Sequence, residues 1–314
     1  MKLERIGVLL MAYGSPDSID DIEAYFTEIR GGEKPRPEEV EELRERYRRI
    51  GGRSPLLEIT KQQAEALEEY LKAWGVAARV YIGMKHWRPF IEDAVNVMVS
   101  DGIRRAVAVA LAPHYSRMSI GGYKDALNHA TSKLDGRLSL SFVESWSDNP
   151  LFLRAWVENI ERALRRFESG VQDVFVLFTT HSLPERILNS NDPYPNQFQG
   201  SCRRVAKRAN LKLWTFAYQS AGLRKEKWLG PDVLEKLAEL AGSGHHNILI
   251  VPIGFVADHL EIVYDIDVEC QEFANANNIN LVRAEMLNTS PIFIAALAEI
   301  VREQIEGGSV CPKD

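Results

Sequence analysis

The chain has 314 residues, of which 45% are hydrophobic and 26% charged, and its formal net charge at pH 7 is −6. This composition is typical of a soluble globular protein with room for two domains, and the acidic balance argues against nucleic-acid binding. No signal-peptide pattern opens the chain and no apolar run approaches the ~18–20 residues that span a bilayer, so we expect a cytoplasmic protein without a transmembrane segment.

Short apolar runs rich in β-branched residues alternate with longer helical patterns. The predicted strands are, in chain order, residues 6–12, 78–83, 106–112, 138–143, 174–179, 211–218, 248–253 and 279–282. Helices are predicted between them, for example over 60–74, 89–100, 151–167 and 231–241. Several strand runs are apolar throughout, as in a parallel sheet covered on both faces. The pattern therefore predicts an α/β fold with right-handed crossovers.

The order of the elements repeats in the two halves of the chain. The fourth predicted strand leads into Asn149-Pro150 and a helix, and the eighth leads into Ser290-Pro291 and a similar helix over 292–305. In both places the polar residue before proline predicts a capped helix start. The repeat indicates two structural units built alike.

We predict two facing Rossmann-like domains, each a four-stranded parallel sheet flanked by helices. The first covers residues 1–145 plus a C-terminal helix at about 291–314, and the second covers residues 146–290. No GxGxxG pattern follows a predicted strand, so a dinucleotide fingerprint is absent. Ligands of open parallel sheets bind outside the carboxyl ends of the strands, and two facing domains would gather these ends around one cleft.

The cysteines give no sign of a disulfide framework or of an iron–sulfur cluster. Cys202, Cys270 and Cys311 are far apart, odd in number and without a CxxC pair. A four-cysteine cluster needs one more thiolate than the chain has. We expect ordinary reduced thiols.

An acidic pattern follows the seventh predicted strand. Glu261, Asp265 and Glu269 lie four residues apart, so on an α-helix they would form one stripe, with head groups about 5–6 Å apart. Carboxylates stacked in this way repel one another, and a bound cation would relieve the repulsion. A solvated acidic helix face is the alternative.

One histidine follows another predicted strand of the same half. His181 comes just after the run 174–179. If neighbouring strands bring it near Glu261, one imidazole and one carboxylate make an incomplete metal site with open positions for a substrate. They could equally form a proton-transfer pair, or His181 could simply bond a loop carbonyl. The residue pattern leaves these readings open.

Over nearly its whole length the chain resembles the ferrochelatases, which insert Fe²⁺ into a porphyrin late in haem synthesis. The segments that carry the resemblance are MAYG at 11–14, IGGRSPL at 50–56, HSLP at 181–184, DPYP at 192–195, WLGP at 228–231 and GFVADHLE at 254–261. The last of these, with the YDID that follows at 264–267, is the most specific. HSLP alone is weak.

The resemblance implies roles for matching residues. His181 is similar to the histidine that faces the porphyrin centre and takes pyrrole protons or binds iron, with Glu261 as its partner. Asp265 and Glu269 resemble an acidic relay toward solvent. Tyr13 resembles the axial ligand of the metallated product on the opposite face. The matches to residues that hold the macrocycle and its carboxylates are Arg30, Arg46, Tyr47, Ser54 and Tyr123, and further cleft residues are Lys85, His86 and Trp228.

The resemblance also favours a substrate. The segment Met11-Ala12-Tyr13-Gly14 is similar to the bacterial branch that uses coproporphyrin III, where it replaces an Asn-(Leu/Met)-Gly-Gly segment. Coproporphyrin III carries four propionates against two in protoporphyrin IX, and a set of arginines and hydroxyls suits a highly carboxylated ring. We therefore expect insertion of Fe²⁺ into coproporphyrin III to give coprohaem.

Several alternatives stay open. They are protoporphyrin IX as the substrate, a cobalt chelatase for sirohydrochlorin, and a porphyrin or haem carrier without chelation. We expect no organic cofactor and no iron–sulfur cluster, Fe²⁺ as a substrate, and an additional divalent cation such as Mg²⁺ at the acidic stripe. We also expect a monomer that makes only transient contacts with neighbouring haem-pathway enzymes.

Overall fold

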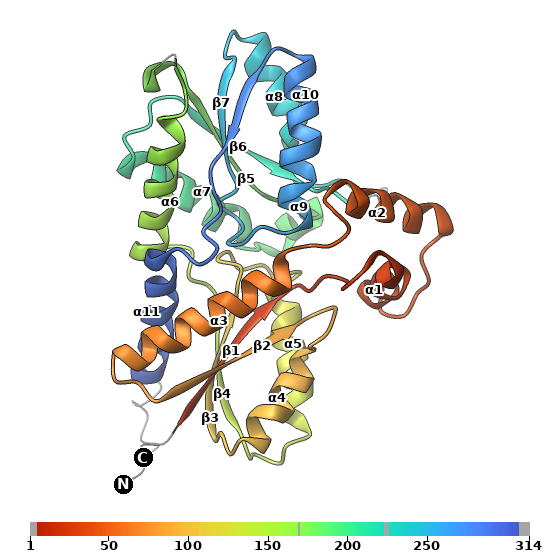
Figure 1. The fold of residues 1–314 in the computed structure, drawn as a ribbon, viewed down its shortest axis with the longest axis vertical. Coiled ribbons are helices and arrows are strands. Elements are labelled where there is room, and N and C mark those ends of the chain that lie inside the picture. The colour runs from red at the N-terminus through yellow and green to blue at the C-terminus, as the bar shows by residue number, and fades with distance from the viewer. Residues whose placement is uncertain (1–4, 169, 223–225, 308–314) are drawn as a thin grey trace.

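The chain forms two stacked α/β units, one above the other in Figure 1. The structure is a computed structural model that describes residues 5–168, 170–222 and 226–307. Each unit contains a four-stranded, all-parallel sheet flanked by helices. The predicted fold class is therefore confirmed.

The first sheet has the order β2-β1-β3-β4. Its strands are β1 (Ile6–Ala12), β2 (Ala78–Met84), β3 (Arg105–Ala110) and β4 (Ser139–Val143). The second sheet has the order β6-β5-β7-β8, which is the same arrangement with each strand number raised by four. Its strands are β5 (Phe175–His181), β6 (Trp214–Gln219), β7 (Asn247–Val251) and β8 (Asn280–Arg283). The identical permutation gives the repeat seen in the sequence a structural basis.

The helices of the first half and the connection into the second are α1 (Ile22–Ile29), α2 (Pro37–Arg49), α3 (Leu56–Ala73), α4 (Ile91–Ser100), α5 (Ile120–Ser132) and α6 (Pro150–Leu164). Those that follow are α7 (Tyr194–Arg208), α8 (Val233–Gly242), α9 (Leu260–Val263), α10 (Gln271–Ala276) and α11 (Pro291–Gly307). Short 3₁₀ turns are η1 (Ile19–Asp21), η2 (Val171–Asp173) and η3 (Glu185–Ser190), and η4 (Asp265–Cys270) is a π-helix.

Strand β6 begins three residues later than predicted, at Trp214 rather than Leu211. The reason is the end of α7, where Asn210 adopts a left-handed conformation with φ 51°. The amide of Leu211 then donates to the carbonyl of Ala206 at 2.9 Å. This six-to-one bond closes the helix, so Leu211 belongs to the helix end.

The two similar helix starts are capped differently. At α6 the Asn149 side chain accepts hydrogen bonds from the amides of Leu151 and Phe152, both at 3.0 Å, as predicted. At α11 the expected side-chain cap is wrong. The carbonyl of Ser290 accepts from the first turn, but its buried hydroxyl has no hydrogen-bond partner among the residues that the structure describes.

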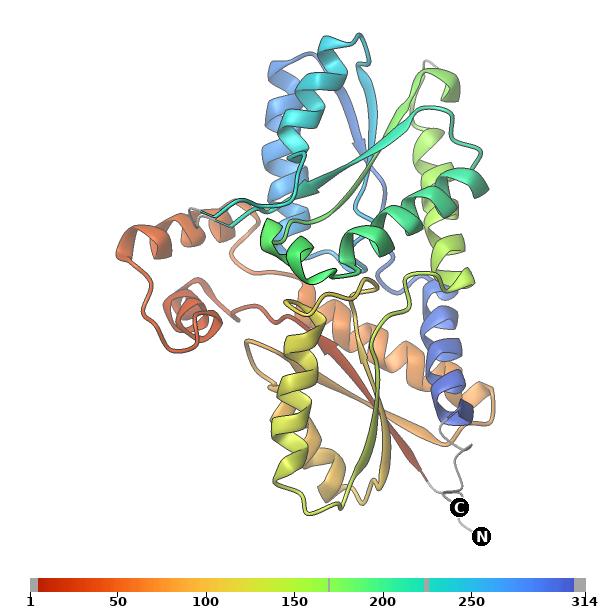
Figure 2. The same ribbon diagram turned by 180° about the vertical axis from the view of Figure 1, so that it is seen from behind.

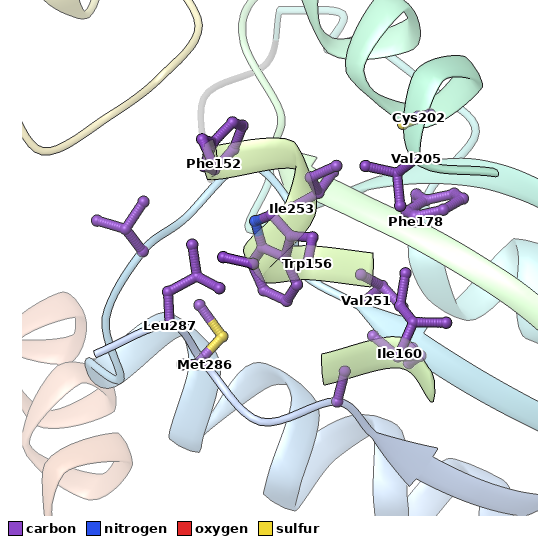
Figure 3. Close-up of a cluster of buried hydrophobic side chains, with 14 of the residues drawn as sticks. Phe152, Trp156, Ile160, Phe178, Cys202, Val205, Val251, Ile253, Met286 and Leu287 are labelled. Carbon is purple, nitrogen blue, oxygen red and sulfur yellow. The ribbon is translucent and has the colours of Figure 1, made fainter. Parts of the chain in front are cut away.

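The main core runs through both units. The largest fully buried side chain of this core is Trp156 of helix α6. Figure 3 shows it among residues of β5, β7 and α7. Helix α11 packs against α6 and also against α3 of the first unit. Figure 2 shows it beside both helices. The C-terminal helix therefore contacts both halves of the chain.

Helices α1 and α2 project sideways from the stacked units in Figures 1 and 2, and we call residues 19–53 the arm. Its small core contains Ile22, Val40 and Tyr47, and Leu260 of α9 packs against it. The arm thus starts in the first unit and reaches the segment after β7. None of the helices within the described ranges is long and apolar enough to cross a membrane.

The unequal caps give a stability prediction. We expect Asn149→Ala to lower the free energy of unfolding by about 0.5–2 kcal/mol, because two helix amides lose their acceptor. Ser290→Ala is the matched control and should change it by less than about 0.5 kcal/mol, since its hydroxyl makes no bond. Urea unfolding followed by circular dichroism measures both. Equal losses of unfolding free energy in the two variants would contradict the assignment of a side-chain cap to Asn149 and not to Ser290.

Candidate active site

Two chain segments meet at the carboxyl end of the second sheet. His181 is the last residue of β5, and the neighbouring strand β7 continues into the segment 254–261. Gly254 permits their close approach, because a Cβ at this position would lie 1.9 Å from Oγ1 of Thr180. Only glycine leaves room for the threonine here. The predicted meeting of His181 and Glu261 follows from this packing.

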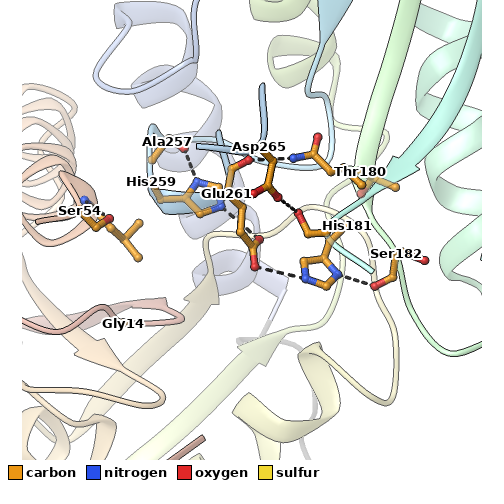
Figure 4. A network of polar contacts seen from close by, with 12 residues as sticks. Gly14, Ser54, Thr180, His181, Ser182, Ala257, His259, Glu261 and Asp265 are labelled. Carbon is orange, nitrogen blue, oxygen red and sulfur yellow. Dashed lines mark hydrogen bonds and ion pairs between the residues drawn. The ribbon is translucent and has the colours of Figure 1, made fainter. Parts of the chain in front are cut away.

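The centre of the site is a carboxylate between two imidazoles (Figure 4). Oε1 of Glu261 lies 3.3 Å from Nε2 of His181, and Oε2 lies 3.5 Å from Nε2 of His259. His181 and Glu261 are each about one third exposed, at 33% and 34%. The pair is therefore sheltered but open to a ligand.

The orientation of each ring is fixed by its other nitrogen. Nδ1 of His181 donates to the carbonyl of Ser182, and Nδ1 of His259 donates to the carbonyl of Ala257 at 2.9 Å. A carbonyl only accepts, so both Nδ1 atoms carry hydrogen and both Nε2 atoms face Glu261. An Nε2 lone pair or proton is thus presented at the carboxylate on each side.

The charges of the pair shift both pKa values. Burial alone would lower the pKa of His181, but the charge and hydrogen bond of Glu261 outweigh it and raise that pKa to about 9. Burial would likewise raise the pKa of Glu261, and the two histidines instead hold it well below its usual range. At neutral pH the pair is an imidazolium beside a carboxylate.

Three residues of this site were not identified from the sequence. His259 is the second imidazole on Glu261, and its place two residues away in the same specific segment was the available signal. Nε2 of Gln219 donates to the backbone carbonyl of Glu261 at 2.9 Å. Ser220 donates to the carboxylate of Asp265. The last two come from the end of β6, for which the sequence predicted no role.

The predicted acidic stripe does not lie on one α-helix. Helix α9 ends at Val263, and η4 is a π-helix in which the amide of Glu269 donates to the carbonyl of Tyr264 at 2.9 Å, five residues back. The wider turn breaks the four-residue spacing. Asp265 is buried, whereas Glu269 is exposed.

Asp265 is the electrostatic neighbour of Glu261. Burial and the charge of Glu261 raise the pKa of Asp265 to about 7, against the hydrogen bond from Ser220 and the charge of Arg46, whose Nη1 lies 3.9 Å away. In the described ranges, no three His, Cys, Asp or Glu residues are grouped to hold a metal ion. An additional divalent cation here stays a prediction.

Aromatic residues of the first unit face the same charge. Burial first, and then the charge of Glu261, raises the pKa of Tyr13 and Tyr47 well above that of free tyrosine. The pKa of Tyr123 is raised by burial first, then by Tyr13 and by the charge of Glu261. The three phenols therefore remain protonated. Tyr13 is the most exposed of them, at 44%, and is open to a ligand.

A cationic group stands beside these phenols. Nζ of Lys85 lies 5.5 Å from the ring centre of Tyr123, and the ring of His86 lies 4.6 Å from that of Tyr13. Burial lowers the pKa of Lys85, and burial together with the Lys85 charge lowers that of His86 to about 4. His86 is therefore neutral at pH 7, so its imidazole adds no charge to this side of the site.

Three residues with predicted carboxylate contacts, two of them in the arm, are already bonded within the protein. Arg30 contacts the buried carboxylate of Glu39 at 2.8 Å, and Arg46 contacts Glu42 at 3.0 Å. The Ser54 hydroxyl accepts from the amide of Leu56 at 3.3 Å, at the start of α3.

Trp228 lies near the segment that follows His181, because its backbone pairs with Pro184. Its ring nitrogen is buried and has no hydrogen-bond partner within the described part of the chain. The structure thus brings His181, Glu261 and Asp265 together with Arg46. Arg30 lies in a separate ion pair.

This arrangement can hold a cation and move protons. Glu261 supplies a fixed negative charge, His181 supplies a nitrogen that binds either a proton or a metal, and Asp265 changes protonation near neutral pH.

The fold defines the class. The chain is similar to the crystal structure of the sirohydrochlorin chelatase SirB from Bacillus subtilis subspecies spizizenii, with a TM-score of 0.61 and 16% identity over 97% of this chain and 98% of that one. At this identity the likeness shows the fold alone, which is that of the chelatases.

Sequence places the chain within that class. The family model described as Ferrochelatase matches residues 5–305. The chain is 45% identical to a protein named Ferrochelatase from Herpetosiphon aurantiacus, over 96% of this chain and 99% of that one. It is 44% identical to a Coproporphyrin III ferrochelatase from Geobacillus kaustophilus, covering 96% of each. The chain belongs to the ferrochelatase family and is a metal-chelating lyase.

The pKa of His181 gives a direct test of the pair. In Glu261→Gln the negative charge is lost while burial remains, so the pKa of His181 should fall from about 9 to about 6.5 or below. NMR titration of the imidazole measures it. Glu269→Gln is the control, because this exposed carboxylate should leave the value near 9. A pKa that does not move in Glu261→Gln would contradict the pairing.

Proposed function

We propose that this protein inserts Fe²⁺ into coproporphyrin III to give coprohaem in haem biosynthesis. The observation that carries the proposal is the His181–Glu261 pair, at 3.3 Å, within a chain of the ferrochelatase family. The porphyrin would lie between the two units, bounded by residues 1–145 with the C-terminal helix and by residues 146–290. Tyr13 would face it from the first unit and His181 from the second.

The chemistry requires exchange of two inward N–H protons for a metal ion through the centre of a planar ring. Distortion of the ring exposes nitrogen lone pairs, and contacts at its periphery can supply the strain energy. Because His181 is an imidazolium at neutral pH, it must first pass its proton on. Asp265, with a pKa of about 7, is the neighbouring group able to take one up. His181 then acts as a base toward the pyrroles, taking their two protons one at a time and passing each on toward Asp265 and solvent before the next.

Charge balance favours the same order, in which His181 gives up its proton before it acts on the porphyrin. An arriving Fe²⁺ ion and the imidazole proton compete for the negative charge of Glu261 and for Nε2 of His181. Tyr13 stays a neutral phenol until a metal approaches it, because burial and Glu261 raise its pKa. Proton release and metal entry are therefore coupled at one carboxylate. Glu269, exposed at the outer end, would pass charge to solvent.

Substrate choice rests on the arm. Relatives at 41–44% identity are named Coproporphyrin III ferrochelatase, while the Herpetosiphon relative is named only Ferrochelatase. Arg30 and Arg46 each present further N–H groups beyond their internal ion pairs, and a guanidinium can serve two carboxylates. With Ser54, they suit a ring that carries four propionates.

Loss of the imidazole should abolish insertion. We expect His181→Ala to lower kcat by about 10²–10⁴-fold, the usual contribution of a positioned base, while porphyrin binding followed by fluorescence persists. Anaerobic absorption spectra with Fe²⁺ measure the rate. His129→Ala, on the exposed side of α5, is the control. More than about a tenth of wild-type activity in His181→Ala would show that His181 is not the base.

Porphyrin preference tests the substrate. Coproporphyrin III should have a higher kcat/KM than protoporphyrin IX, because two missing carboxylates leave cationic or hydroxyl groups unpaired at about 1–3 kcal/mol each, or roughly 5–150-fold. Arg30→Met should reduce the difference in kcat/KM between the two porphyrins. Steady-state rates with both porphyrins decide the matter, and equal kcat/KM values would refute coproporphyrin as the substrate.

A further inference from the structure

The hydroxyl of Tyr194 lies directly behind His181. Tyr194 opens α7 and is only 6% exposed. Its oxygen is 2.8 Å from the backbone carbonyl oxygen of His181 and 2.7 Å from Oγ1 of Thr180. Because a carbonyl only accepts, the phenol donates to His181 and the threonine hydroxyl donates to the phenol. Burial raises the pKa of Tyr194 well above its ordinary value, so the phenol keeps its proton.

This short chain of bonds constrains both members of the ion pair. On one side it holds the backbone oxygen of His181, and with it the direction in which the ring leaves β5. On the other side Thr180 abuts Gly254, the first residue of the segment that carries Glu261. A single buried hydroxyl therefore supports the geometry from which His181 reaches Glu261.

Two residues earlier, Asp192 ties the same region to the first unit. Its carboxylate accepts from the amide of Tyr194 at 3.0 Å. It also accepts from the hydroxyl of Ser116 at 3.0 Å and from the amide of Arg117 at 2.9 Å. The last two residues belong to the loop between β3 and α5, and α5 carries Tyr123. Asp192 thus spans the two sides of the site.

We propose that Tyr194 and Asp192 are positioning residues for metal insertion, a role that rests on the proposed function. Tyr194 sets the direction of the His181 imidazole, and Asp192 sets the distance between the side that carries His181 and the side that carries Tyr123. Proton and metal transfer are sensitive to misplacement of about 1 Å, which can cost up to about 10²-fold in rate. Loss of the Tyr194 hydroxyl therefore slows insertion without weakening porphyrin binding.

Tyr194→Phe tests the first role. We expect kcat to fall about tenfold or more, with the KM and Kd for coproporphyrin III within about twofold of wild type. Tyr218→Phe is the matched control, a tyrosine 3% exposed on β6 that is the register partner of Thr180. Its kcat should stay within about twofold of wild type. Equal losses in the two variants overturn the role.

A second measurement separates this role from the proposed function. The side-chain ¹⁵N resonances of His181, assigned with His181→Gln, should move in Tyr194→Phe and not in Tyr218→Phe. This signal needs no turnover. If the wild-type protein inserts no iron, the proposed function fails while the resonances still decide the position of His181. Resonances that stay in place in Tyr194→Phe overturn the role.

Asp192→Asn tests the spacing. The substitution keeps the side chain's size but replaces one of the two acceptor oxygens by an NH₂ donor, so either the Tyr194 amide or the Ser116–Arg117 pair loses its acceptor. The KM for coproporphyrin III should rise about threefold or more, and the Ser116→Ala variant, which removes one of the two donors, should show a smaller rise in the same direction. Wild-type KM in Asp192→Asn overturns the assignment of Asp192.

Discussion

The site depends on keeping one carboxylate ionised in a sheltered position between two imidazoles. Burial works against the charge of Glu261, and the charge persists because His181 and His259 both face it. The same carboxylate makes His181 a stronger base than a free imidazole. It also adds to the larger effect of burial in raising the pKa of Asp265 and of the Tyr13 phenol across the site. One negative charge thus contributes to the protonation state of the groups on both sides.

Backbone geometry holds that carboxylate. The site is assembled where parallel strands end, and β5 and β7 are direct neighbours. The missing side chain of Gly254 lets the chain after β7 fold down against Thr180. Gln219, at the end of β6, then bonds the backbone of Glu261 itself. Three adjacent strands therefore fix one functional group, which explains why its position is defined although its side chain is one third exposed.

The sequence was sufficient for the order of the strands and for the repeat, because apolar runs are local signals. The pairing of His181 with Glu261 was expected from the family resemblance, whereas the residue pattern alone left it open. The sequence was insufficient where tertiary context decides. A spacing of four between Asp265 and Glu269 suits an α-helix, but both residues lie in the π-helix η4. Ser290 has the composition of a cap, yet its hydroxyl is buried without a partner. The pairing of Arg30 with Glu39 depends on how the arm folds, which periodicity does not reveal.

The contacts between the two units differ in strength, because some are buried and others are exposed to solvent. Asp192 is 8% exposed and accepts two hydrogen bonds from the first unit; a charged acceptor buried in this way contributes about 1.5–3 kcal/mol per bond. The arm meets the second unit through Arg49 and Glu272, whose side chains are 36% and 61% exposed. An exposed ion pair of this kind contributes at most about 1 kcal/mol. The arm has further contacts with the second unit, because Leu260 packs against its core and Arg46 lies 3.9 Å from the buried Asp265. The Arg49–Glu272 pair is therefore the weaker, outer part of the arm's contact, whereas the bonds of Asp192 hold the β3–α5 loop to the start of α7 behind His181.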